Sequence, residues 1–308
     1  MKKSKLNVLP ENPELDDGSK VVLSGRFPKW LHRKLPAGSE LWKTRAILKT
    51  LHLPTVCEEA KCPNLLECFS KKTATFLVMG KECTRNCPFC NIDFSATPKP
   101  LEKDEPDRIA QSVQALGLKH VVITMVARDD LDDGGARHLA NIIHETRILN
   151  PETKIEILTG DFEGKTSSYD TVLAAKPEIF NYNIETVRRL TPKIRHRATY
   201  DRTLSLLRYI CDHDSHQKVK SGLMVGLGET ADEVKETICD LYDAGCDIIT
   251  IGQYLQPSRH KFRVKAFITP KQFEEYANYG RSIGIKQMYC GPFVRSSYNA
   301  AALLDEKK

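Results

Sequence analysis

What the sequence lacks already excludes several classes of protein. It has no stretch of about 18 consecutive apolar residues, so no transmembrane helix is expected. Its first twenty residues, MKKSKLNVLPENPELDDGSK, are polar and lack the apolar region of a secretory signal peptide. Internal repeats and low-complexity segments are missing as well. We therefore expect a cytoplasmic protein that does not contact a membrane.

The sequence also lacks a strong excess of either charge. The formal net charge is +6 over 308 residues, and the basic residues are spread along the chain. We therefore expect no nucleic-acid partner, although an acidic protein partner is permitted. The most concentrated basic segment is RRLTPKIRHR, residues 188–197. It is either a solvated helix end or loop, or a contact for a phosphate, a carboxylate or an acidic protein.

Short apolar runs alternate with helical patterns from residue 73 onward, and this alternation predicts the fold. Six repeated β-then-α units imply a parallel sheet with right-handed crossovers. The sheet is either open and doubly wound or an incomplete barrel, and in both cases chemistry gathers where strands end. The runs are 73–80, 120–127, 154–160, 178–185, 219–227 and 247–255, and the helical patterns lie near 104–117, 136–149, 166–175, 199–212, 230–244 and 270–283.

The two ends of the chain fall outside this alternation. Residues 1–72 carry little strand signal and contain one short amphipathic helix, expected over 41–53. Residues after 285 do not continue the βα pattern. We therefore expect three segments: an N-terminal extension over 1–72, an α/β unit over 73–285 and a C-terminal tail over 286–308.

Cysteine, in contrast, is abundant. The chain has ten cysteines, and six of them lie between residues 57 and 90. Disulfides are disfavoured in the cytosol, so clustered cysteines indicate metal or redox chemistry. The remaining four, Cys211, Cys239, Cys246 and Cys290, are scattered, and we expect them to be small buried apolar residues.

One cysteine cluster, CTRNCPFC over residues 83–90, directly follows the first predicted strand. Cys83, Cys87 and Cys90 can hold three irons of a cubane cluster, which leaves the fourth iron for a small molecule. The alternative is a zinc site, which would require a fourth ligand. The nearest histidines that could supply it are His52 and His120.

This loop, placed after the first strand of a parallel βα array, resembles the cluster-binding loop of the radical S-adenosylmethionine (SAM) superfamily. The resemblance implies a partial (βα)6 TIM-type barrel. It also implies that the amino and carboxylate groups of SAM chelate the open iron. Reductive cleavage of SAM would then yield methionine and a 5′-deoxyadenosyl radical.

The second cluster, CEEAKCPNLLEC, contributes Cys57, Cys62 and Cys68. Six cysteines this close suggest two [4Fe–4S] clusters rather than one. Together with KWLHRKLPAG, GQYLQPS and GPFVRSSYNA, both spacings closely resemble the lipoyl synthase family. The resemblance implies that Ser297, the second serine of RSSY, completes the auxiliary cluster. From the residues alone, without the resemblance, Ser297 would be interpreted as a serine in a turn or at the cap of a helix.

Three further segments are expected to contact SAM. Asn183 and Glu185 alternate along NYNIET (181–186) and can both point toward the site. Gly226 and Glu229 belong to the glycine turn GLGET, expected against adenine. Gly134 and Gly135 follow the second strand, where the superfamily binds the methionine part, although the neighbouring Asp132 or Asp133 can instead cap a helix. A surface-polar role for Asn183 and Glu185 is the alternative.

The resemblance implies the reaction and the partners. Two sulfurs would be inserted at C6 and C8 of an octanoyl group that is amide-linked to a lysine of a lipoyl carrier domain. The carrier would belong to a 2-oxoacid dehydrogenase E2 or to the glycine cleavage H protein. An electron donor such as ferredoxin or flavodoxin, and an iron–sulfur carrier, would serve the enzyme. The alternatives are another radical SAM sulfur-inserting enzyme, such as a biotin-synthase-like one, or a non-enzymatic zinc protein.

Overall fold

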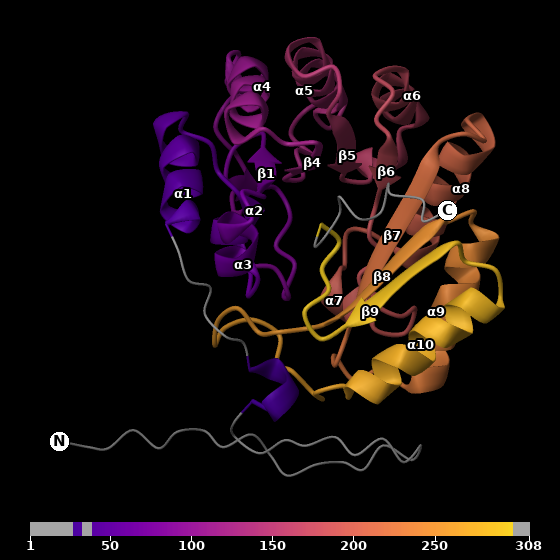
Figure 1. Ribbon diagram of the computed structural model, residues 1–308. Helices are drawn as coiled ribbons and strands as arrows, with labels where there is room; N and C mark the ends of the chain where they lie inside the picture. Colours follow the sequence, from indigo (N-terminus) through magenta and orange to yellow (C-terminus); the bar gives the residue numbers. More distant parts are fainter. Residues whose placement is uncertain (1–26, 33–38, 298–308) are drawn as a thin grey trace.

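The computed structural model describes residues 27–32 and 39–297. Its main feature is a sheet of seven parallel strands in the order β1-β4-β5-β6-β7-β8-β9 (Figure 1). Each of the six apolar runs expected to form strands coincides with one of the first six members of this sheet to within one residue at its start or contains it, so that prediction is confirmed. The seven strands are β1 Thr75–Val78, β4 His120–Met125, β5 Lys154–Leu158, β6 Ile179–Asn181, β7 Lys218–Val225, β8 Ile248–Gln253 and β9 Gln287–Gly291.

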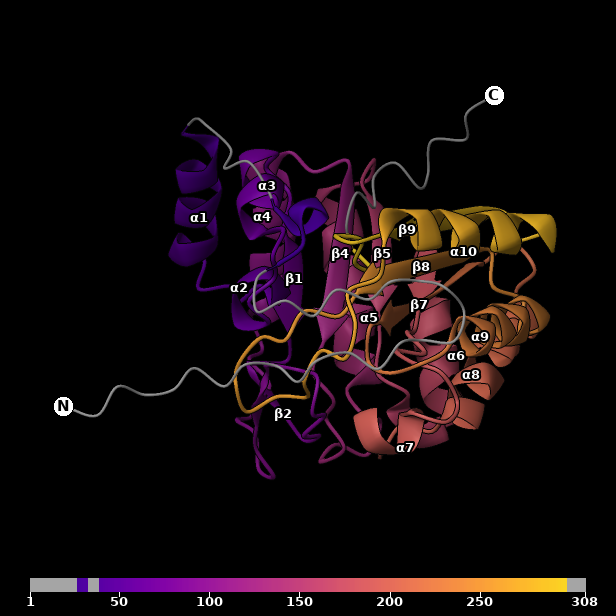
Figure 2. The ribbon, with the colours of Figure 1, turned by 90° about the horizontal axis from the view of Figure 1, so that it is seen from below.

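Helices cover the outer face of this curved sheet, and the barrel is partial as expected (Figures 1 and 2). The strand order starts at β1 and ends at β9, and these two edges do not pair within the described residues. The covering helices are α4 Glu105–Leu116, α5 Ala136–Leu149, α6 Thr166–Ala174, α8 Tyr200–His213, α9 Ala231–Asp243 and α10 Pro270–Ser282, with the short α7 Thr191–Ile194 before α8. None of the helices in the described part is long and apolar enough to span a membrane.

The seventh strand corrects one expectation. Residues after 285 were expected to fall outside the βα pattern, yet β9 pairs in parallel with β8 from Ile248↔Gln287 to Gly252↔Gly291. The sequence QMYCG hides this strand because it is only half-buried at the edge of the sheet. An edge strand with mixed burial lacks the continuous apolar run that marks a parallel strand covered on both faces.

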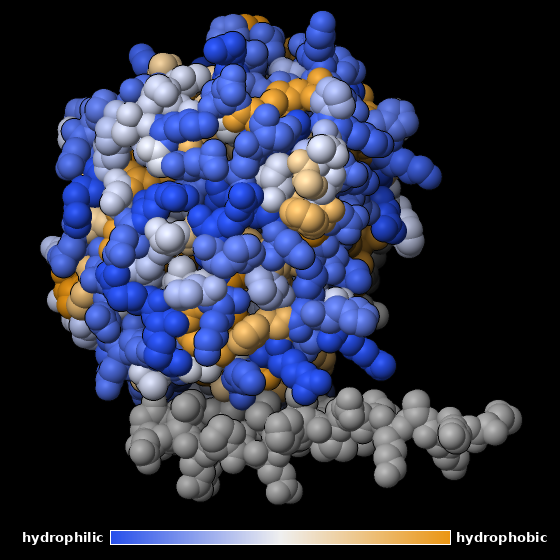
Figure 3. Space-filling model, turned by 180° about the vertical axis from the view of Figure 1, so that it is seen from behind, coloured by the Kyte–Doolittle hydropathy of each residue, from blue (hydrophilic) through white to orange (hydrophobic). Residues whose placement is uncertain are grey.

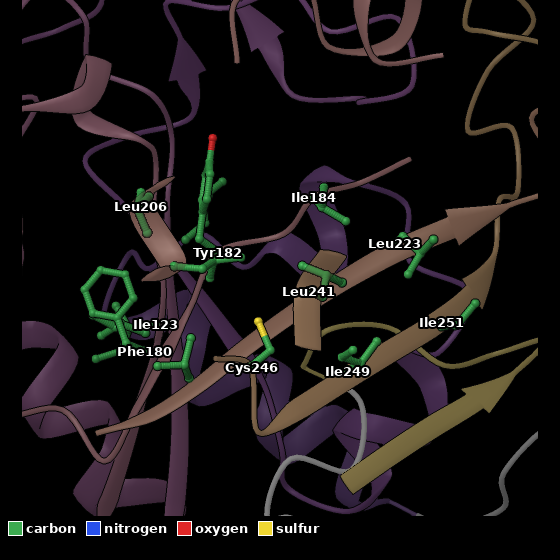
Figure 4. Close-up of a cluster of buried hydrophobic side chains, with 14 of the residues drawn as sticks. Ile123, Phe180, Tyr182, Ile184, Leu206, Leu223, Leu241, Cys246, Ile249 and Ile251 are labelled. Carbon is green, nitrogen blue, oxygen red and sulfur yellow. The ribbon is translucent and has the colours of Figure 1, made fainter. Parts of the chain in front are cut away.

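The main apolar core lies between the sheet and the helices. Ile123, Ile249 and Ile251 point outward from their strands and pack in one buried cluster with Leu206 and Leu241 of the covering helices (Figure 4). A separate small cluster of Val122, Ile179, Ile248 and Tyr289 lies on the inner face. Because neighbouring strand residues point to opposite faces, these two clusters identify which residues face into the barrel. On the outside, hydrophilic side chains dominate the face seen in Figure 3.

The N-terminal segment packs against the β1 side of the sheet (Figure 2). It contains the short 3-10 helix Lys29–Leu31, the expected helix as α1 Glu40–Thr50, and the short helices α2 Val56–Glu59 and α3 Leu65–Ser70. Leu48 and Phe69 are buried in the main core, and Thr44 Oγ1 donates to Phe69 O at 2.8 Å. An isolated bridge, Thr55↔Phe76, joins this segment to β1. The three-segment division stays a prediction, since much of 1–72 and of 286–308 lies outside the described residues.

Candidate functional site

The CTRNCPFC loop lies beyond the carboxyl end of β1, where the strands of such sheets carry chemistry. It includes β2 Glu82–Cys83, which pairs with β3 Asp93–Phe94. Thr84 is tied to the end of β4 by its amide and its hydroxyl, both donating to Ala127 O at 3.0 Å. Pro88 O accepts from the amide of Phe262 at 2.8 Å, which joins the loop to the segment after β8.

Arg85, inside this loop, is the centre of an ionic network that the sequence analysis missed. Its side chain is nearly buried and lies 2.7 Å from Asp129 Oδ1 and 2.5 Å from Asp161 Oδ1. Asp161 is fully buried and also pairs with Arg202 at 3.1 Å. Burial alone would raise the pKa of Asp161, but the adjacent Arg85 guanidinium more than offsets it and lowers the pKa. The charged network therefore anchors the cysteine loop to the ends of β4 and β5.

The loop cysteines lie in a protected environment near Glu185. The pKa of Cys87 is raised to about 11 and that of Cys90 to about 12, mainly by burial, and the Glu185 carboxyl contributes to both increases. The structure therefore brings Glu185 close to the loop, as the sequence suggested. Thiols with raised pKa values lose their protons when a metal binds, so metal binding here is coupled to proton release.

Asn183 and Glu185 follow β6 and are linked to each other. Asn183 Nδ2 donates to Glu185 Oε1 at 3.1 Å. Glu185 has a left-handed backbone, with φ of 68°, and burial raises the pKa of its carboxyl. Arg195 holds this turn in place, since its Nη1 donates to Asn183 O at 2.5 Å and its guanidinium stacks over the ring of Tyr182. Their expected contacts with SAM remain predictions.

The two glycine segments have packing roles within the chain itself. A Cβ at Gly135, where φ is 88°, would lie 2.4 Å from Met79 Sδ, and one at Gly134 would lie 3.3 Å from Phe162 Cα. Asp133, not Asp132, holds the start of α5, because its carboxylate accepts from the amides of Gly135 and Arg137. Glycine at 134 and 135 thus lets this turn sit against the end of β1.

The GLGET turn is likewise held by its own side chain. The Glu229 carboxylate accepts from the amide of Gly226 at 2.5 Å and from that of Leu227 at 2.8 Å. A Cβ at Gly226 would lie 2.2 Å from Gln253 Nε2 and 2.4 Å from Ala266 O. The close approach that requires glycine is therefore to residues of this chain, and contact of the turn with adenine stays a prediction.

The second cysteine cluster lines a pocket beside the start of β1 and β4. Ser297 lines this pocket together with the three cysteines of CEEAKCPNLLEC, Cys57, Cys62 and Cys68. The pKa of Cys57 is raised to about 12 and that of Cys68 to about 11, mainly by burial, and the nearby Cys62 contributes to both increases. We call this the auxiliary pocket. Arg295, His120 and Val122 also line it.

Cys290, a competing candidate for the fourth ligand, lies elsewhere. Tyr289 packs in the inner cluster with Val122, whereas Cys290 packs with the outer core. Adjacent strand residues point to opposite faces, so Cys290 points toward the helices and away from the auxiliary pocket. Cys290 is half-buried rather than buried as expected, and so are Cys211 and Cys239, whereas Cys246 is buried; partial burial raises the pKa of Cys290 to about 12.

A buried polar layer lies inside the barrel next to the auxiliary pocket. Lys220 Nζ lies 2.7 Å from Glu156 Oε1, and both side chains are fully buried. His120 Nε2 lies 3.5 Å from the other oxygen of Glu156. Lys220 and Glu156 were not singled out from the sequence, because a buried ion pair in a parallel strand looks like an exposed polar position when only the pattern of residues is read; His120 was named only as a possible zinc ligand.

The basic segment 188–197 is largely neutralised by the chain itself. Arg188 pairs with Asp201 at 2.5 Å, Arg189 with Glu233 at 2.6 Å, and Arg197 with Asp129 at 3.2 Å. Arg195 is buried. These ion pairs favour the interpretation of segment 188–197 as a solvated helix end or loop over a contact for an acidic partner.

Comparisons with known proteins agree with this arrangement. A model of the radical SAM superfamily matches residues 77–241, and a model of the N-terminal domain of lipoyl synthase of that family matches residues 2–62. The chain is 62% identical over 305 residues to a lipoyl synthase of Protochlamydia amoebophila (strain UWE25), with 98% of this chain and 94% of that protein covered. The chain belongs to the lipoyl synthase family. A lipoyl synthase of Chlamydia felis is 52% identical, covering 91% of this chain and 90% of that one.

Solved structures support the lipoyl synthase fold at much lower identity. Methylornithine synthase is 14% identical with a TM-score of 0.52, covering 90% of this chain and 89% of that one. A maturase of the [FeFe]-hydrogenase, HydG, is 16% identical with a TM-score of 0.53, covering 82% of this chain and 68% of that one. These likenesses show the partial barrel alone.

Lipoyl synthases are radical SAM enzymes that insert sulfur and use SAM and [4Fe–4S] clusters, and the thiols of this chain fit such clusters. Of the six cysteines in the two triads, Cys57 is buried and the other five are half-buried. In the described part of the chain, however, no three His, Cys, Asp or Glu side chains surround a point where one metal ion could sit.

Proposed function

We propose that this lipoyl synthase inserts two sulfur atoms, at C6 and C8, into an octanoyl group amide-linked to a lysine of a lipoyl carrier domain. The supporting observation is that Ser297 lines one pocket with Cys57, Cys62 and Cys68. Ser297 is remote in sequence from the three cysteines, and only the fold brings it to them. A hydroxyl in that position completes a set of four donors of the kind a cubane cluster requires.

The two cysteine sites have different tasks in this proposal. Cys83, Cys87 and Cys90 would hold the cluster that, together with SAM, supplies a radical able to remove hydrogen from unactivated carbon. The Arg85 network fixes the loop that carries these thiols. Glu185 and Asn183 offer a carboxylate and an amide beside the loop, suited to the amine and the ribose hydroxyls of SAM.

The auxiliary site, by this proposal, donates sulfur. Cys57, Cys62, Cys68 and Ser297 would hold the second [4Fe–4S] cluster. A serine oxygen is a harder ligand than a thiolate and matches iron–sulfur chemistry less well. The iron bound to Ser297 is therefore the one that this chain holds least firmly, which suits a site that must give up its contents.

A lipoyl carrier is the substrate of the family, and its identity here is part of the proposal. The carrier would be a 2-oxoacid dehydrogenase E2 or the glycine cleavage H protein. Ferredoxin or flavodoxin would supply electrons, and an iron–sulfur carrier would restore the auxiliary site. The test is anaerobic turnover of an octanoylated lipoyl-domain peptide, with the product mass measured. A product lacking both added sulfurs, while SAM is still cleaved, would refute the sulfur-insertion assignment.

Replacing Ser297 by cysteine tests the role of that residue. Ser297→Cys should keep a full auxiliary cluster and still cleave SAM, yet make little lipoyl product, because a thiolate holds iron more firmly. Cys290→Ala is the matched control and should behave as wild type, since Cys290 points away from the pocket. Loss of the auxiliary cluster in Cys290→Ala, with the cluster retained in Ser297→Ala, would show that the ligand has been misassigned.

A further inference from the structure

Ser296 and Ser297 are neighbours, yet their side chains belong to different sites. Ser297 lines the auxiliary pocket. Ser296 Oγ donates a hydrogen bond of 2.8 Å to Asn183 Oδ1, across 113 residues of sequence. Asn183 is almost buried, with 9% of its surface exposed, and this bond is partly buried. The backbone between two consecutive serines therefore spans from one cysteine site to the residues beside the other.

From Asn183 the contacts continue to the cysteine loop. Asn183 Nδ2 donates to Glu185 Oε1 at 3.1 Å, and the Glu185 carboxyl is close enough to act electrostatically on Cys87 and Cys90. Arg195 also fixes the backbone of Asn183, because its Nη1 donates to Asn183 O. The amide of Asn183 is thus held at both ends, and a shift of Ser296 would disturb its bond to Glu185.

The barrel wall is shaped to admit the segment that carries Ser296. A Cβ at Gly222 on β7 would lie 3.0 Å from Asn183 Oδ1 and 3.2 Å from Ser296 Oγ. A Cβ at Gly252 on β8 would lie 2.0 Å from Val294 O. Two inward positions on adjacent strands are therefore glycine where any side chain would push the segment out. The N-terminal part of the chain also holds this segment, because Asn64 Nδ2 donates to Phe293 O at 2.8 Å.

We propose that Ser296 is a positioning residue that couples the two cysteine sites of this enzyme through its hydrogen bond to Asn183. SAM held by Asn183 and Glu185 favours the geometry that keeps Ser297 in the auxiliary pocket, and loss of that geometry weakens SAM binding. The two effects are equal by thermodynamic linkage. The inference rests on the proposed function, in which Asn183 and Glu185 contact SAM and Ser297 holds iron.

The first test measures SAM affinity in anaerobically reconstituted protein with oxidised clusters, which bind SAM without cleaving it. Ser296→Ala should weaken SAM binding about fivefold, the effect of losing one side-chain hydrogen bond. Ser282→Ala is the matched control, because Ser282 bonds only within α10, to Tyr279 O, and it should leave the affinity unchanged. In an Asn183→Ala background, Ser296→Ala should have no further effect, since the two residues act as one unit.

The second test measures the effect of SAM on the auxiliary pocket. Loss of one iron under mild oxidation, followed by electron paramagnetic resonance, should be slower with SAM than without it in wild-type protein. In Ser296→Ala, SAM should lose this protective effect. If SAM affinity stays within about twofold of wild type and SAM still protects the iron, Ser296 only anchors the segment and the inference is wrong. A wild-type protein that binds no SAM at all would instead overturn the proposed function, and the inference with it.

Discussion

The buried pair of Lys220 and Glu156 makes a sharp prediction about stability. Both side chains are fully buried, with 2.7 Å between Nζ and Oε1. Removal of one partner leaves the other as an uncompensated charge in the barrel interior, which typically costs 3–5 kcal/mol. For a chain of this size about 1 kcal/mol shifts the melting temperature by about 2 °C, so Lys220→Met should melt about 6–10 °C lower.

The loss should also depend on pH, and the charges give its sign. Burial alone would raise the pKa of Glu156, but the Lys220 charge and the adjacent His120 together more than offset it and lower the pKa. In the wild type this carboxylate therefore stabilises the fold above its unfolded pKa, near 4.3, and that contribution is lost as pH falls. In Lys220→Met only His120 remains beside the buried carboxylate, so burial raises the pKa of Glu156 relative to the wild type, and the destabilisation should grow as pH rises above about 4.3.

Thermal unfolding of the anaerobically reconstituted variants, followed by circular dichroism, measures both effects. Lys43→Met is the matched control, because Lys43 forms an ion pair of 2.6 Å with Glu40 but is 65% exposed. An exposed pair contributes about 1 kcal/mol or less. Adding Glu156→Gln to Lys220→Met should restore much of the loss. Equal melting temperatures for the two lysine variants, or no recovery in the double variant, would refute the reasoning.

Two further predictions concern the cysteine loop CTRNCPFC and the glycine turn at residues 134–135. Alanine in place of all three cysteines of CTRNCPFC should abolish 5′-deoxyadenosine formation and leave about half of the iron, that of the auxiliary cluster; continued SAM cleavage would contradict the assignment. Gly135→Ala should destabilise the protein by more than 1 kcal/mol, because it combines a left-handed backbone with a contact of 2.4 Å to Met79 Sδ. Gly80→Ala has a similar φ and open space around it, so it should cost less in urea unfolding, and equal costs would contradict the packing argument.

Much of the fold could be read from the sequence because its strands are buried on both faces. Runs such as HVVITMVA (120–127) are apolar almost throughout, and the helices between them show clear amphipathic spacing. β9 escaped notice because an edge strand needs only partial burial. The two cysteine triads could also be identified from the sequence, since the residues of each triad are close in sequence and their chemistry is specific.

The rest of the site depends on contacts that no local pattern reveals. Arg85 was visible inside CTRNCPFC, but its partners Asp129 and Asp161 come from two other strand ends. Ser296 looked like a spare neighbour of Ser297, and only the folded barrel shows that its hydroxyl reaches Asn183. Likewise, the sequence left two interpretations of the basic segment 188–197, a solvated helix end or loop and a contact for an acidic group, because its acidic partners in this chain lie 13 to 68 residues away in sequence.

The bond between Asn64 and Phe293, which joins residues 229 positions apart, has a consequence for how the protein matures in the cell. A chain is synthesised from its N-terminus, and its early parts fold first. The CTRNCPFC loop has all its thiols within eight consecutive residues, so it can receive iron as soon as its surroundings form. The auxiliary pocket lacks Ser297 until more than two hundred further residues have been translated and the β9 edge has folded. Cells should therefore fill the two sites in a fixed order, and a ribosome-stalled chain should carry only the first.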